Sequence, residues 1–131
     1  MDVRNLSGER VIIAGLRKLE RAVLSKEKGG TGDLSLLFVR EGAMRKLSKK
    51  WQKKDKAANV LAFPGGELSL GEIVLCPPVI YKDAAKYGIT YQEAVELMFV
   101  HGLLHLLGYD HTNARQEKRM KSKERHYLSA L

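Results

Sequence analysis

The sequence has 131 residues, of which 44% are hydrophobic and 29% are charged, and its single cysteine is Cys76. This length predicts one domain, residues 1–131, around one core, and a lone cysteine excludes an internal disulfide. No run approaches the ~18 consecutive apolar residues of a membrane-spanning helix, and the N-terminus lacks an apolar signal region, so we expect a cytoplasmic protein without membrane contact.

The net charge of +8 is unevenly distributed along the chain. Residues 45–56 contain seven basic residues and one acidic residue, and residues 112–131 contain six basic and two acidic residues. The intervening residues 60–111 contain six acidic residues and two lysines. Two basic segments that flank an acidic one suit a polyanion bound across a cleft, although a solvated surface would have the same composition.

The first half of the chain predicts a helix, a strand and a second helix. Apolar residues recur at helical spacing over residues 8–25, and Ser7 can cap the start of this helix. Residues 26–33 hold three glycines without the lysine of a phosphate-binding loop, so we interpret them as a turn. Residues 34–40 predict a buried strand. Residues 41–52 predict a helix with Met44, Leu47 and Trp51 on one face and lysines on the other.

The second half predicts two short strands followed by helices. The strands cover residues 60–63 and 70–76, each ended by proline, and a helix follows over residues 79–87. Thr90 and Glu93 form a capping box for a helix that extends to about residue 107 and is apolar nearly all round, which predicts burial. A basic helix closes the chain over residues 113–128. The order of elements predicts an α+β fold, a small mixed sheet packed with helices.

Three histidines dominate the run from residue 101 to residue 111. His101 and His105 are spaced i, i+4 and therefore project from one helix face. Gly108 can end the helix, so that the chain turns and brings His111 towards the other two. Three neutral imidazoles predict a site for one Zn²⁺ per chain, with a fourth position left open as in catalytic sites. Nickel, cobalt or copper are alternatives.

The spacing of these histidines and Gly108 matches that of metzincin peptidases, with one difference. In that pattern a glutamate directly follows the first histidine and acts as the general base. Here the position is Gly102. The metal geometry is retained, whereas peptidase chemistry is disfavoured.

The run HGLLHLLGYDH resembles the signature of the bacterial YbeY family, endoribonucleases that are also called rRNA maturation factors. Residues 55–64, DKAANVLAFP, resemble the D-x-P-T-[ND]-V-L-S-F-P segment of that family, and residues 70–75, LGEIVL, resemble its L-G-D-I-x-I strand. The resemblance implies a compact α+β fold of the zincin-like metal-dependent hydrolases, with the metal-binding helix at its centre.

The resemblance also implies a function: single-strand-specific cleavage of ribosomal RNA in small-subunit 3′-end maturation and ribosome quality control. The implied partners are ribosomal RNA, the small ribosomal subunit and assembly factors that include a ribosome-assembly GTPase. Catalysis would depend on His101, His105 and His111 through the metal. Candidate RNA-binding residues are Lys49, Lys50, Gln52, Lys53 and Lys54.

One departure from the family pattern bears on activity. The family usually has an arginine after the aromatic residue of this segment, but here Trp51 is followed by Gln52. A guanidinium binds a phosphate with two parallel hydrogen bonds, which a glutamine cannot do. Ala58 and Ala62 also replace the threonine and serine of the central segment. We therefore expect slower cleavage than in a member with the arginine.

Several alternatives stay open at this point. Asp110 is either a carboxylate that orients an imidazole or a cap of the following turn, and His126 is expected on the surface rather than as a fourth ligand. Beside a metal-dependent endoribonuclease, the sequence allows a non-catalytic ribosome-assembly factor with a structural metal, and more weakly a metallopeptidase or amide hydrolase.

Overall fold

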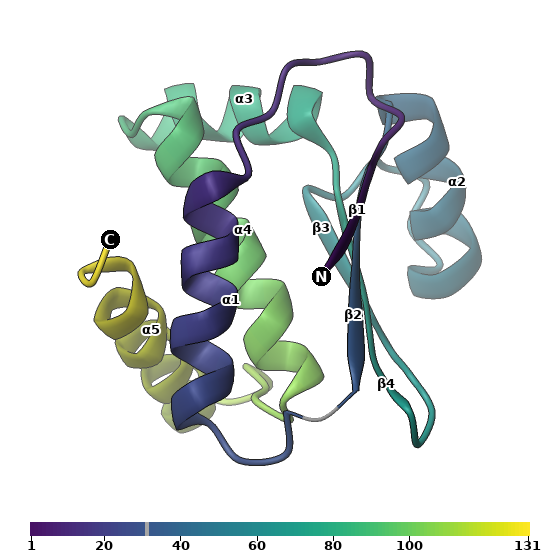
Figure 1. Cartoon of the computed structure of the whole chain (residues 1–131). Helices are drawn as coiled ribbons and strands as arrows, with labels where there is room; N and C mark the ends of the chain where they lie inside the picture. Colours follow the sequence, from purple (N-terminus) through teal and green to yellow (C-terminus); the bar gives the residue numbers. More distant parts are fainter. Residues whose placement is uncertain (31) are drawn as a thin grey trace.

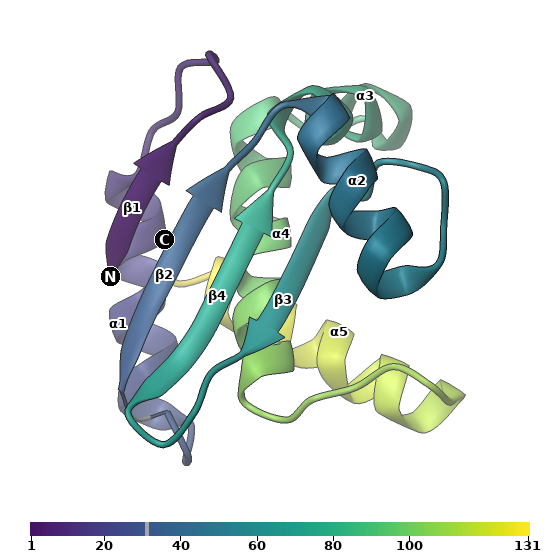
Figure 2. The ribbon, with the colours of Figure 1, turned by 90° about the vertical axis from the view of Figure 1, so that its right-hand side faces the viewer.

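The computed structural model describes residues 1–30 and 32–131 and contains one four-stranded mixed sheet. The strands are β1 (Asp2–Asn5), β2 (Asp33–Phe38), β3 (Val60–Pro64) and β4 (Ser69–Leu75), in the spatial order β1-β2-β4-β3. β1, β2 and β4 are parallel, and β3 pairs antiparallel with β4 at the edge, where Ala62 lies opposite Ile73. Figure 2 shows the sheet face-on.

Five helices surround this sheet: α1 (Ala14–Lys26), α2 (Glu41–Gln52), α3 (Pro77–Tyr87), α4 (Tyr91–Leu106) and α5 (Ala114–Leu128). α1, α4 and α5 lie on one side of the sheet, α2 lies on the other, and α3 crosses one end (Figure 1). This arrangement confirms the predicted α+β fold.

The core is built around α4. Seven residues of this helix are buried, including Phe99, Leu103 and Leu104, because its apolar surface faces α1, α5 and the sheet at once. A smaller cluster lies beneath α2 and contains Met44, Val74 and Cys76. Cys76 is fully buried here, and the predicted burial of the α4 helix is confirmed.

Gly102 allows α4 to approach the sheet closely. A Cβ atom built at Gly102 would lie 3.1 Å from Cγ2 of Ile73 and 3.2 Å from Cγ2 of Val60. These separations are shorter than ordinary van der Waals contacts between carbon atoms. A side chain at this position would therefore push α4 away from β3 and β4.

The predicted capping box at the start of α4 is confirmed. The Thr90 hydroxyl accepts a hydrogen bond from the Glu93 backbone N–H, and the Glu93 carboxylate accepts one from the Thr90 N–H, both at 3.0 Å. Asn113 caps α5 in a similar way, because its side chain accepts a hydrogen bond from the Gln116 N–H.

Four sequence predictions about the fold are corrected. The first helix begins at Ala14 rather than at residue 8, and Ser7 does not cap it. The Ser7 hydroxyl instead donates to Asn5 and accepts from the Glu9 N–H, which stabilises a turn before the helix. β1 was not predicted. α3 begins at Pro77 rather than residue 79, since proline fits the first turn of a helix.

The fourth correction concerns Trp51, which is 59% exposed rather than packed in the core with Met44 and Leu47. Its ring contacts the edge of Phe63 at a centroid distance of 5.8 Å, and the Lys50 ammonium lies 5.2 Å from the Trp51 ring. The aromatic side chain thus lies on the surface at the C-terminal end of α2.

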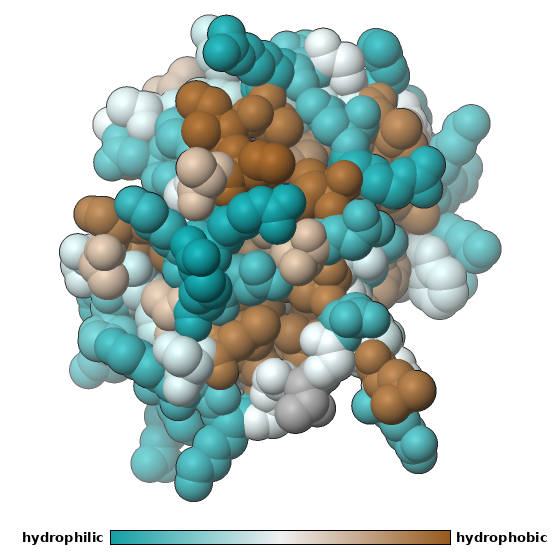
Figure 3. Space-filling view, in the orientation of Figure 1, coloured by the Kyte–Doolittle hydropathy of each residue, from teal (hydrophilic) through white to brown (hydrophobic). Residues whose placement is uncertain are grey.

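Of the helices in the described residues, none combines the length and the apolar character that crossing a membrane requires. On the face shown in Figure 3, a hydrophobic patch covers part of the segment that leads into α1, where Ile12 is exposed.

Candidate metal centre

The three histidines come from α4 and from the loop that follows it. His101 and His105 lie one turn apart on α4, as their spacing predicts. After Leu107 the backbone takes a left-handed conformation at Gly108, with φ of +100°. The N–H groups of Gly108 and Tyr109 then donate to the carbonyls of His105 and Leu104, both at 3.0 Å, and this tight turn reverses the chain.

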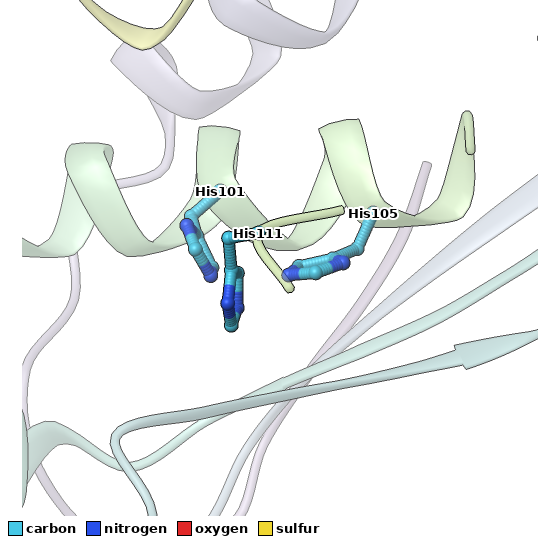
Figure 4. Close-up of side chains that lie close together, drawn as sticks. All are labelled: His101, His105 and His111. Atoms are coloured by element: carbon cyan, nitrogen blue, oxygen red, sulfur yellow. The ribbon is translucent and has the colours of Figure 1, made fainter. Parts of the chain in front are cut away.

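The reversal brings His111 beside the other two imidazoles (Figure 4). The ring centroids lie 4.7 Å apart for His101 and His105, 4.9 Å for His105 and His111, and 5.4 Å for His101 and His111. Each residue offers a ring nitrogen, and these nitrogens all lie within 4.8 Å of one another. One ion could therefore contact all three.

A buried carboxylate fixes the orientation of His101. Oε2 of Glu124, on α5, lies 2.7 Å from Nδ1 of His101, and the Glu124 residue is only 8% exposed. Because a carboxylate accepts hydrogen bonds, Nδ1 carries the proton and donates it, which leaves the Nε2 lone pair free. Carboxylates commonly hold metal-binding histidines in this way.

Sequence reasoning missed Glu124, and it left two roles open for Asp110: orienting an imidazole or capping the following turn. Asp110 accepts a hydrogen bond from the backbone N–H of His111 at 2.7 Å, so its carboxylate stabilises the loop. A signal for Glu124 was present in the sequence. Met120, Glu124 and Tyr127 are spaced as one helix face, and all three are buried. An acidic residue on the apolar face of a helix needs a partner.

The environment of His105 favours a neutral imidazole. Burial lowers the pKa of His105, and the proximity of His101 and His111 lowers it further. A neutral imidazole has the free lone pair that a metal ligand needs. The donor set, its convergence and the Glu124 contact therefore fit a first-row divalent metal such as Zn²⁺. His126 is exposed on α5 and does not belong to this cluster.

The histidines face a cleft of about 530 Å³ between α4, β3 and the end of α2. Its other lining residues include Gln52, Asn59 and Ala62. Of the candidate RNA-binding residues, Gln52 lines this cleft, whereas Lys49, Lys50, Lys53 and Lys54 are exposed on and just after the last turn of α2. The lysines thus lie beside the cleft rather than within it.

A polar network anchors the loop that carries His111. The Tyr109 hydroxyl donates to Glu27 at 2.6 Å, and Tyr127 and Lys123 also donate to the Glu27 carboxylate. Burial alone would raise the pKa of Glu27, but these three hydrogen bonds outweigh it, so the pKa of this carboxyl is lowered. Glu27 therefore ties the end of α1 to the loop and to α5.

Comparison with known proteins points to one family. Residues 6–131 match the family model described as Endoribonuclease YbeY. The chain is 35% identical over 147 residues to the Endoribonuclease YbeY of Acidothermus cellulolyticus. This alignment covers 99% of this chain and 90% of that protein.

Two further comparisons agree with this match. The chain is 40% identical over 104 residues to the Endoribonuclease YbeY of Myxococcus xanthus, which covers 73% of this chain but only 35% of that longer protein. The solution structure of a Thermotoga maritima protein superposes with a TM-score of 0.68 at 26% identity, which covers 96% of this chain and 86% of that one.

Proposed function

Because the chain belongs to the endoribonuclease YbeY family, we propose that it cleaves single-stranded RNA with a metal ion held by His101, His105 and His111. The single observation that carries this proposal is the convergence of the three imidazoles at the floor of an open cleft. We propose Zn²⁺ as the ion, with nickel, cobalt or copper as alternatives that the same donors accept.

When bound, such a metal would polarise a phosphate and favour ionisation of the attacking hydroxyl. The residues of this chain would supply the positioning. Glu124 keeps the Nε2 lone pair of His101 directed away from α5, and burial lowers the pKa of His105, which favours its neutral form. The Glu27–Tyr109 contact holds the loop of His111 in place.

Electrostatics would bring the substrate to this centre. The lysines at the end of α2 are exposed beside the cleft. α5, which carries six basic residues, packs against α4 behind His101 (Figure 2). A single-stranded RNA that crosses the histidines would lie beside the lysines of α2, and the basic residues of α5 would add to the overall attraction of a polyanion. Gln52 would contact the phosphate backbone within the cleft through hydrogen bonds alone.

A non-catalytic ribosome-assembly factor is the second candidate, because Gln52 occupies the position where the family pattern has an arginine. In that case the metal would stabilise the fold. A peptidase is disfavoured because the position of the general-base glutamate is Gly102, where a side chain would crowd Ile73 and Val60.

The test is cleavage of a labelled single-stranded fragment of ribosomal RNA by zinc-loaded protein, with His105→Ala purified in parallel. His126→Ala is the matched control, because His126 is an exposed histidine outside the cluster. The proposal predicts metal-dependent cleavage by the wild type and by His126→Ala, and none by a folded His105→Ala. Cleavage by all three would indicate a contaminating ribonuclease. Loss of folding in His105→Ala, without cleavage by the wild type, would favour the assembly factor.

We extend the proposal to the maturation of the small-subunit rRNA 3′ end and to ribosome quality control in the cytoplasm. The resemblance of the histidine run to the YbeY signature supports this, as does the lysine-rich end of α2 beside the cleft. The small ribosomal subunit and a ribosome-assembly GTPase would be the partners. Cosedimentation with purified small subunits tests the first of these, and absence of the protein from the subunit peak at low salt would argue against it.

A further inference from the structure

A second cavity adjoins the histidines on the side away from the sheet. It has a volume of about 400 Å³ and lies between α4 and α5. His101 and His111 line both this cavity and the cleft described above. The two hollows therefore meet at the metal centre, so a substrate held there can extend into either.

The walls of this cavity are mainly apolar, with Leu97 and Met98 contributed by α4 and Met120 by α5. Leu97 stands out among them. It is half-buried, yet among the described residues it is not part of either hydrophobic cluster and is not packed against one. Leu97 also borders a small hollow beside the core residues Ile80 and Ala84, and the rest of its apolar surface forms part of the wall of this cavity.

The charges around the cavity oppose a phosphate. Glu117 and Glu124 line it, and its one lysine, Lys121, is already paired with Glu117 at 2.9 Å. The Lys121–Glu117 pair has no net charge and Glu124 adds a negative one, so these side chains offer no net attraction to an anionic group. The cavity thus suits a neutral group with apolar faces and polar edges, which describes a nucleobase.

We propose that this cavity accepts one unpaired base of the RNA, from a nucleotide next to the bond that is cleaved. The inference rests on the proposed function and names the part of the substrate that this side of the centre recognises. The phosphate would lie at the histidines while the adjoining base turns into the space between α4 and α5. A base stacked and paired in a duplex cannot enter, so the cavity would select for single strands.

The test uses a short single-stranded RNA whose cleavage position has first been mapped with the zinc-loaded wild type. An abasic nucleotide then replaces each neighbour of the cleaved bond in turn. Binding is measured by fluorescence anisotropy with the metal-free protein, which leaves the RNA uncut, and cleavage is measured separately.

Leu97→Ala shortens the wall of the cavity, and Leu97→Met preserves its apolar character. Leu24→Ala is the control, because Leu24 is half-buried but lines neither the cleft nor this cavity.

For the wild type we expect one abasic position to weaken binding about tenfold, within the range that loss of a base contact costs. Leu97→Ala should bind the intact RNA more weakly and lose most of this penalty, whereas Leu97→Met and Leu24→Ala should retain it. Equal binding of all abasic RNAs by the wild type would overturn the proposal, as would a full penalty in Leu97→Ala. If the wild type neither binds nor cleaves the intact RNA, the proposed function itself fails, and the base site fails with it.

Discussion

Replacement of Glu124 by glutamine tests whether the carboxylate behind His101 strengthens metal binding. The side chain is buried and lies 2.7 Å from Nδ1 of His101. Glutamine has the same size and its amide oxygen can still accept the hydrogen bond, so the substitution removes the negative charge alone. A charge-assisted hydrogen bond is roughly twice as strong as a neutral one, a difference of about 1 kcal/mol. We therefore expect Glu124→Gln to weaken zinc binding about fivefold, and Glu124→Ala to weaken it by roughly 10- to 100-fold.

The assay is competition for zinc against a chromophoric chelator at pH 7, with circular dichroism to verify that each variant is folded. Glu117→Gln is the matched control, since it removes a carboxylate from the same helix near the centre, but one that is exposed and paired with Lys121. It should bind zinc like the wild type. Equal zinc affinity in the wild type and in folded Glu124→Ala would refute the reasoning, because the contact would then have no effect on the ligand it holds.

Three further predictions follow from the packing and charges described above. Gly102→Ala should lower the free energy of unfolding by about 1–2 kcal/mol, because the overpacking of α4 against the sheet exceeds the gain in helix propensity. Gly42→Ala is the control in urea unfolding: its added methyl group meets nothing within 4 Å, so this variant should stabilise the protein. Equal effects at both sites would contradict the argument. Glu27 has a pKa below its ordinary value of 4.5, so its ionised form stabilises the fold above that pH and the contribution is lost as the pH falls through the lower, folded-state pKa. The difference in unfolding free energy between wild type and Glu27→Gln should therefore be constant at pH 6–7 and shrink below pH 4.5, and a difference independent of pH would show that ionisation of Glu27 is not involved. Gln52→Arg should raise the rate of RNA cleavage about tenfold. Gln52→Lys should raise the rate less, because an ammonium lacks the planar, paired N–H donors of a guanidinium. An unchanged cleavage rate in both variants would contradict a phosphate contact at this position.

Features that depend on residues close together along the chain could be predicted from the sequence alone. The capping box of Thr90 and Glu93 and the i, i+4 spacing of His101 and His105 each act within one or two helical turns. Gly108 likewise reverses the chain locally and brings His111 back. For this reason the start of α4, the α+β character of the fold and the meeting of the three imidazoles could all be predicted without a structure.

Features that depend on partners far away in sequence are visible only in the assembled fold. β1 has only four residues and exists because it pairs with β2, about thirty residues later, so its own pattern carried little signal. Trp51 has helical spacing with Met44 but lies in the last turn of α2, where it contacts Phe63 of the edge strand β3 and stays 59% exposed.

The role of Glu124 depends on the packing of α5 against α4, which places a carboxylate 23 residues away in sequence beside His101. Asp110, the nearer carboxylate in sequence, instead accepts a hydrogen bond from the His111 backbone N–H in the loop. Short-range spacing fixes which ligands a helix and its following turn present. The carboxylate that accepts a hydrogen bond from a ligand is determined by which helix packs against that ligand. A buried charge is stable only where the assembled fold supplies its partner.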